Sequence, residues 1–183
     1  MSYTQHFNNK GFTLLESLIA FVILTIGLLG AIGLQAKAKQ ASYDSLQRAA
    51  ALTLANDVMH RLRANDTSDL LSAYNIEIAS TDQANNVKSC LDSSCSSTEM
   101  AAFDVEEWKK QIKAKEFTGT LADARLCITP SSIADSEINV EIVVSWQGRQ
   151  SIKQSSDNQK ISCGINTKNR RLITLNSFIL LRS

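Results

Sequence analysis

The sequence has little of the chemistry from which enzyme sites are built. It contains two histidines and one proline in 183 residues. It has no glycine-rich phosphate loop, no metal-ligand spacing and no nucleophile motif. Lysine and arginine together number 19 against 18 acidic residues, so the overall charge indicates neither a nucleic acid nor an acidic substrate. We therefore expect a protein with no enzymatic activity, no cofactor and no bound metal.

Charge is absent from one long stretch near the N-terminus. The 20 residues 17–36 carry no charged side chain, and most of them are Leu, Ile, Val, Ala, Phe or Gly. About 20 apolar residues in a helix cross the roughly 30 Å hydrocarbon core of a membrane. The sequence therefore predicts one membrane-spanning helix over residues 12–36, while the rest of the chain reads as an ordinary soluble protein.

The segment before this helix is short, polar and free of acidic residues, and it carries Lys10. A conventional secretory signal has an apolar region of about 7–15 residues followed by a cleavage site of the A-x-A type. Ala36 and Ala38 supply such a site, so cleavage after Ala38 is one alternative. The longer apolar run, and the helical pattern that continues through the site, favour a helix that is kept.

Glu16 lies at the start of the apolar run. A carboxylate at the centre of a membrane costs about 2.5–3.5 kcal/mol, and less near the edge. Its spacing from Thr13 is that of a capping box at a helix N-terminus. If the chain were cut after Gly11, Glu16 could instead neutralise the free α-amine of Phe12 in a neighbouring subunit. The two roles are compatible, in different states of the protein.

The heptapeptide 10–16, Lys-Gly-Phe-Thr-Leu-Leu-Glu, resembles the prepilin signal of type IV pilins and pseudopilins. The resemblance implies that a membrane aspartic peptidase cuts after Gly11 and methylates the new N-terminus at Phe12. It also implies that Glu16 aligns neighbouring subunits. The partners it implies are the prepilin peptidase, other major and minor pilins, the inner-membrane assembly platform, and membrane lipid before assembly.

The helix is predicted to continue to Ala64, because residues 35–64 contain no Pro or Gly and repeat apolar residues at a helical period. Residues 37–65 form its amphipathic half. Residues 25–30 and 51–65 resemble the PilV subfamily of minor pilins, with departures at the hydrophobic positions 58, 59 and 62. The single proline, Pro130, lies outside the helix, which favours a minor subunit. Asp57 and Arg61 are four residues apart, and we interpret them as a helix-end ion pair contributing about 0.2–0.5 kcal/mol.

Four cysteines follow the helix, at positions 90, 95, 127 and 163. An even number beyond a membrane-targeting segment favours disulfides, and four cysteines allow about three pairings. The alternatives are a zinc site or free buried thiols. A zinc site favours a close pair at each end, and Cys127 and Cys163 are too far apart for that. We predict the pairs Cys90–Cys95, within one loop, and Cys127–Cys163, between a strand and the approach to the last strand.

Residues 66–183 are expected to form a periplasmic globular head after a leader at 1–11. A helix is predicted at 100–115, with Phe103, Trp108 and Ile112 buried and its charged face in solvent. That face comprises Asp104, Glu106, Glu107, Lys109, Lys110 and Lys113. Strands are predicted at 125–129, stopped by Pro130, at 138–146, near Ile152 and at 171–180. An antiparallel sheet packed on a long N-terminal helix is an α+β architecture, that of the type IV pilin fold.

The expected function is that of a minor pilin in a type IV pilus, placed at the tip or in a priming complex. A minor pseudopilin of type II secretion is the alternative with the same fold. From residue 158 to residue 183 there is no acidic side chain, so a pilus-borne DNA receptor or adhesin is the alternative of another class. The basic residues of this stretch are Lys160, Lys168, Arg170, Arg171 and Arg182. Scarce aromatic residues favour inter-subunit or solubility charge instead.

Overall fold

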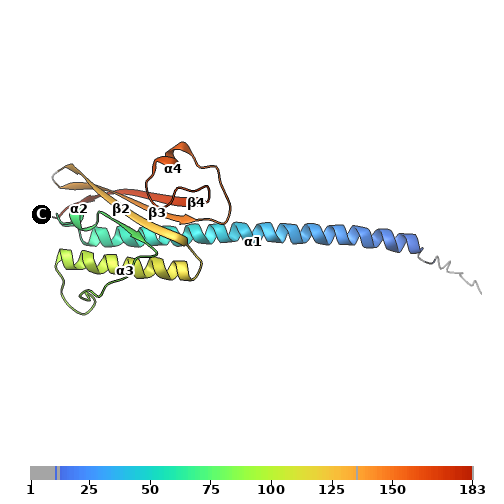
Figure 1. Cartoon of the computed structure of the whole chain (residues 1–183), viewed down its shortest axis with the longest axis horizontal. Coiled ribbons are helices and arrows are strands. Elements are labelled where there is room, and N and C mark those ends of the chain that lie inside the picture. The colour runs from blue at the N-terminus through green and yellow to red at the C-terminus, as the bar shows by residue number, and fades with distance from the viewer. Residues whose placement is uncertain (1–10, 12, 135, 183) are drawn as a thin grey trace, which may run out of the picture. The chain divides into compact units, whose positions relative to one another are not determined.

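The computed structural model describes residue 11, residues 13–134 and residues 136–182. It divides into two units, one ending at Tyr43 and one beginning at Asp44, which we describe separately. The helix α1, Leu14–Ala64, contributes residues to both (Figure 1). With four strands in the second unit, the architecture is α+β, as predicted.

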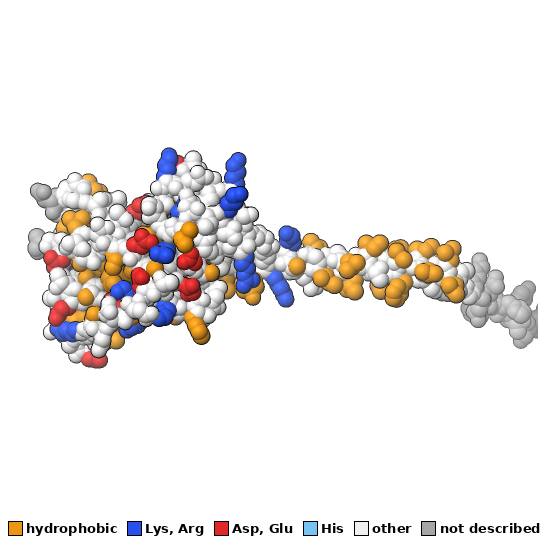
Figure 2. Space-filling view, viewed as in Figure 1, with side chains coloured by type: hydrophobic (Ala, Val, Ile, Leu, Met, Phe, Trp, Pro, Cys, Tyr) orange, Lys and Arg blue, Asp and Glu red, His pale blue; other side chains and the backbone are white. Residues whose placement is uncertain are grey.

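The first unit contains the N-terminal half of α1, whose residues from Leu14 to Lys39 are all exposed. Its most apolar 18-residue window has a mean hydropathy of 2.5, and none of that window is buried. Figure 2 shows apolar side chains along this part of the helix. By length and composition, α1 can cross a membrane.

The second unit contains a four-stranded antiparallel sheet in the order β1-β2-β3-β4. The strands are β1 Ile76–Ala79, β2 Ala122–Ala134, β3 Glu137–Gln147 and β4 Arg170–Leu180. The helices are α2 Leu70–Ala73, α3 Ser97–Phe117 and α4 Ser156–Lys160, together with the C-terminal half of α1. β3 and β4 pair in continuous register from Glu137 opposite Leu180 to Gln147 opposite Arg170.

One hydrophobic core joins α1, α3 and the sheet. Its side chains alternate along β3, where Val140, Ile142 and Val144 are buried in the core. Each fully buried apolar side chain of this size stabilises the fold by about 1.5–3 kcal/mol. The helices contribute Ala51, Leu54, Ala55, Val58, Met59, Leu62, Ala101, Val105, Trp108 and Ile112.

The structure differs from the predicted strands at three places. Pro130 does not end β2, which continues to Ala134. β1 pairs with β2 only as far as Ile128, so the missing N–H of Pro130 falls where β2 has a single neighbour, and proline is tolerated at such an edge. No strand forms near Ile152, and the four-residue β1 was not predicted.

Helix α3 is longer than predicted and buries two of its charges. Ser96 caps it, in a capping box with Glu99. Trp108 and Ile112 are buried as predicted, but Phe103 is only half-buried. The predicted solvated face is wrong at Asp104 and Glu106, which are 2% and 6% exposed.

The two disulfides join Cys90 to Cys95 and Cys127 to Cys163, the pairs that the spacing predicts. The second belongs to a small cluster with Val143, and Ile161 and Leu172 pack against it. Because Val143 alternates with the core residues of β3, this cluster lies on the opposite face of the sheet. The disulfide thereby attaches the loop between β3 and β4 to that face.

Gly164, beside this disulfide, provides a test of the packing. Its φ is +72°, and an added Cβ would overlap the Ser145 hydroxyl and lie 3.1 Å from Cγ of Arg125. Gly119 has φ +69° and no atom within 4 Å of the same position. We expect Gly119→Ala to show only the backbone cost, about 1–2 kcal/mol, and Gly164→Ala to cost clearly more. Urea unfolding of the full chain in detergent, followed by tryptophan fluorescence, measures both, and equal losses would contradict the packing.

Candidate functional site

The predicted cleavage site lies just before α1. Gly11 is exposed, and no atom lies within 4 Å of the position that a Cβ would take. Phe12, the predicted methylation site, lies outside the described residues. Helix α1 begins two residues later, at Leu14. The carbonyl side of the predicted scissile bond therefore belongs to exposed, non-helical backbone, which a peptidase can reach.

Glu16 lies in the first turn of α1 and is exposed. Its backbone N–H donates to Thr13 Oγ1 at 3.3 Å and to the Thr13 carbonyl at 3.1 Å. Thr13 therefore caps the helix in the way that the spacing predicts. Within the described part of the chain, the Glu16 carboxylate has no hydrogen bond or ion pair, so it is available to a partner from outside.

The helix beyond Glu16 exposes an unusually large apolar surface. Single exposed apolar side chains are ordinary on a protein, but a contiguous surface of this size marks contact with lipid or with other protein. Leu14 is 82% exposed, and the large apolar residues after it are at least half exposed. They are Leu15, Leu18, Ile19, Phe21, Val22, Ile23, Leu24, Ile26, Leu28, Leu29, Ile32 and Leu34.

At the other end of α1, a polar cluster fastens the helix to α3. Arg61 Nη1 donates to Asp104 Oδ1 at 2.7 Å, and its Nε donates to Asp57 Oδ2 at 3.2 Å. Asp57 Oδ2 also accepts from Trp108 Nε1 at 3.1 Å. The hydroxyl of Tyr74 donates to Asp104 Oδ2 at 2.9 Å. The predicted ion pair is therefore one part of a network that joins α1, α3 and Tyr74 at the end of α2.

Asn65 completes this cluster at the end of α1. Its side-chain amide donates to the Tyr74 hydroxyl at 3.0 Å and to the Ser97 carbonyl at 2.8 Å. Burial raises the pKa of Tyr74 above its ordinary value, and the Asp104 carboxylate raises it further. Burial alone would lower the pKa of Arg61, but Asp104 and Asp57 raise it. The phenol therefore stays protonated and the guanidinium stays charged.

Sequence reasoning missed the part of Asp104 in this cluster. Its charge suggested solvent, yet it lies three residues after Ala101 and four before Trp108, on the buried stripe of α3. Helical spacing therefore indicated that Asp104 is buried, although its charged side chain suggested exposure to solvent. No group of three metal-ligating side chains occurs among the residues that the structure describes. The cluster is a structural joint between helices.

Two protein-family models match the chain. The model described as the prokaryotic N-terminal methylation motif matches residues 6–32, which include Gly11, Phe12 and Glu16. The model described as type IV pilin Tt1218 matches residues 33–106, which include the amphipathic half of α1 and Asp104. No curated protein and no solved structure matches the chain.

The two matches adjoin one another and agree with the architecture. The methylation-motif match begins before α1 and covers most of its exposed apolar part, and the pilin match begins near the end of that part. Pilins are structural subunits, which explains why the sequence contains few residues and motifs suited to catalysis. The chain is a type IV pilin-like protein.

Proposed function

We propose that this pilin is a minor subunit of a type IV pilus. A prepilin peptidase removes residues 1–11 and methylates Phe12. Residues 12–36 then hold the protein in the inner membrane, with the head at 66–183 in the periplasm. From there the subunit enters the pilus together with other pilins, at the tip or within a complex that primes assembly.

The observation that carries the proposal is the pairing of a methylation motif with an acid, Glu16, that has no partner among the described residues and lies at the head of an exposed apolar helix. A helix that only anchored the head in lipid would gain at most about 1 kcal/mol from Glu16 at its N-terminus, against the cost of a carboxylate in the membrane. In a bundle of such helices, Glu16 can meet the α-amine of Phe12 in the neighbouring subunit. The ion pair would fix the axial register of the two subunits.

Two features support a minor rather than a major subunit. The only proline is Pro130 in β2, so α1 has no proline at which to kink. The sequence 51–65 also resembles the PilV subfamily, and its Asp57, Arg61 and Asn65 lie four residues apart. All three take part in the cluster that joins α1 to α3, so the resemblance falls on residues with a structural role.

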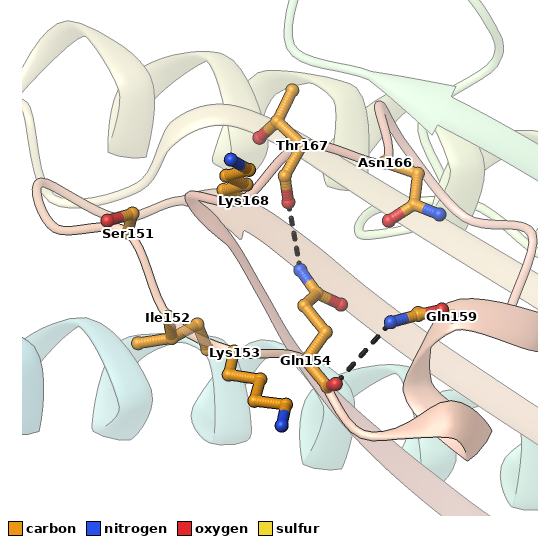
Figure 3. A pocket seen from close by; sticks show the side chains of 8 residues that line it. All are labelled: Ser151, Ile152, Lys153, Gln154, Gln159, Asn166, Thr167 and Lys168. Atoms are coloured by element: carbon orange, nitrogen blue, oxygen red, sulfur yellow. Dashed lines mark hydrogen bonds between the residues drawn. The ribbon is translucent and has the colours of Figure 1, made fainter.

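The structure gives less support to a DNA receptor or adhesin built on the basic C-terminal stretch. Arg170 is 2% exposed and donates to backbone carbonyls, while Arg182 pairs with Asp66 and Lys160 with Asp157. A nearby cleft, about 490 Å³ in volume, is lined in part by Lys168. Figure 3 shows the side chains that line it. No aromatic ring lines this cleft, so a base or sugar has nothing on which to stack.

Processing is the first test. We expect the mature chain to begin at Phe12 with one added methyl group, carrying 18 Lys and Arg (19 minus Lys10) against 18 acids. Intact mass and N-terminal sequencing of protein extracted from membranes measure this. The Gly11→Val variant should keep its leader. A wild-type chain that starts at Met1, or after Ala38, contradicts the proposal.

The second test asks whether the subunit belongs to a type IV pilus or to a type II secretion system. A type II secretion pseudopilin would share the fold and the processing, so neither distinguishes the two. We expect loss of the protein to reduce surface pili and twitching, and to leave secretion of exported enzymes unchanged. The opposite pattern would assign the protein to the secretion system.

A further inference from the structure

The outer edge of β4 is unusually open for a natural sheet. Among the residues that the structure describes, β4 is the last strand in the sheet order and pairs with β3 alone (Figure 1). Natural edge strands are normally protected by charge, proline, bulges or a short length. The nine residues 172–180 contain no charged residue, proline or glycine, and their register with β3 is unbroken.

The backbone along this edge has unused hydrogen-bonding groups. Alternate residues of an edge strand direct their N–H and C=O away from the neighbouring strand. The loop before β4 covers only the start, where Gln154 Nε2 donates to the Arg170 carbonyl at 3.0 Å. From Arg171 to Leu180, the structure as described records no bond to this backbone from outside the sheet except the local one from Ser177 Oγ to the Phe178 carbonyl.

A groove follows the same edge. Two hollows of about 350 and 430 Å³ share Arg48 of α1 and Leu172 of β4, so they adjoin. The larger is lined by the consecutive residues Leu172, Ile173 and Thr174. Consecutive residues point to opposite faces of a strand, so a hollow that touches all three runs along the edge.

One end of the groove is basic. Among the described residues, the smaller hollow is lined by Arg48 and Arg171 against one acid, Asp44. Arg48 has no ion pair in the same described set, and Arg171 donates only to the carbonyls of Asn169 and Gln150. The far end of the edge is apolar, since Phe178 and Leu180 are 64% and 66% exposed.

We propose that the edge of β4 from Arg171 to Leu180 binds an extended segment of another polypeptide chain, which adds to the sheet as a fifth, antiparallel strand. Only extended backbone can satisfy a row of alternating donors and acceptors. The segment is apolar where it meets Phe178 and Leu180. At its other end it carries a carboxylate that pairs with Arg48.

The occupant is a different protein and not a second β4. No acidic side chain occurs from residue 158 to residue 183, so a second β4 would leave Arg48 unpaired. The inference concerns the head alone and holds wherever the subunit lies in a pilus. It gives the partner a stated chemistry, namely an extended, mostly uncharged strand with an acidic end.

Photo-crosslinking of the full chain in its own membranes tests the proposal. Benzoylphenylalanine replaces Thr174, Asn176 or Phe178, one at a time; all three are exposed on the face of β4 opposite the core. Mass spectrometry should place the three crosslinks on one segment of one other protein, two residues apart and in reversed order. Ser131 lies on the same face, two strands away, and should give no such crosslink.

A charge variant supplies the second measurement. Arg48→Glu should reduce the crosslink yield from position 174 by roughly tenfold. Lys153→Glu, the same charge reversal elsewhere on the head, should leave the yield unchanged. The proposal is overturned if no crosslink forms, or if the crosslinked positions are not spaced two residues apart on one segment. It is also overturned if the crosslinks fall on a second copy of this chain or equal those from Ser131. Equal yields from the two charge variants overturn the assignment of the acidic end.

Discussion

Replacing Asp104 by Ala is expected to lower the free energy of unfolding by about 3–5 kcal/mol, the range for breaking a buried ion pair. The variant leaves Arg61 without its shorter carboxylate contact and leaves the buried Tyr74 hydroxyl without its acceptor. Arg61 keeps Asp57, which places the expected loss at the lower end of that range. Urea unfolding of the full chain in detergent measures it, with Trp108 as the fluorescent reporter within the cluster.

Glu107 offers a matched control on the same helix. It pairs with Lys110 at 2.8 Å near the surface, where such pairs contribute about 0–1 kcal/mol. Glu107→Ala should therefore unfold close to wild type. If Asp104→Ala cost no more than Glu107→Ala, the cluster would not be the joint between α1 and α3 that its geometry indicates.

Glu16→Ala is expected to abolish incorporation into pili while leaving the protein cleaved and in the membrane. If Glu16 meets the α-amine of Phe12 in the neighbouring subunit, its loss leaves that amine unpaired among apolar helices. An unpaired buried charge costs about 3–5 kcal/mol. The variant keeps the backbone N–H that Thr13 caps, and it otherwise loses only the attraction of the acid to the helix N-terminus, about 0.3–1 kcal/mol. Immunoblots of membrane and sheared-surface fractions, compared with wild type, measure the outcome.

The Thr13→Ala variant separates the two roles at this helix end. It removes the hydroxyl that accepts from the Glu16 N–H but leaves the carboxylate in place. We expect it to be incorporated normally. Normal incorporation of Glu16→Ala would reject the inter-subunit ion pair, and an equal loss of both variants would assign the effect to capping.

The long helix and the two principal strands could be predicted because their patterns are long. Residues 35–64 hold a helical period without proline or glycine, and β3 alternates between core and opposite face. β1 escaped prediction because four residues within a polar region are too few to display a period. The prediction that Pro130 ends its strand was wrong because a proline interrupts a sheet only where a neighbouring strand needs its N–H. The end of that neighbouring strand cannot be read from the sequence alone.

The candidate functional residues also divide into those that local sequence predicts and those that depend on the fold. Gly11, Phe12 and Glu16 lie within one short motif, so local sequence suffices to propose their roles. Asp104 meets Arg61 across 43 residues of sequence, and its carboxylate suggested solvent until the fold supplied a guanidinium and a phenol. The open edge of β4 likewise depends on strand order, which cannot be read from the strand itself.

One helix serves two physical environments, and the change between them is abrupt. Every core side chain of α1 follows Gln47, whereas every residue of the helix before Gln40 is exposed. Substitutions before this boundary should be judged by transfer into hydrocarbon, so that one apolar residue can replace another at little cost. Substitutions after it meet a packed interior, where the same exchange changes volume and shape. A library of apolar replacements along α1 should therefore divide into a tolerant and an intolerant half within about two helical turns.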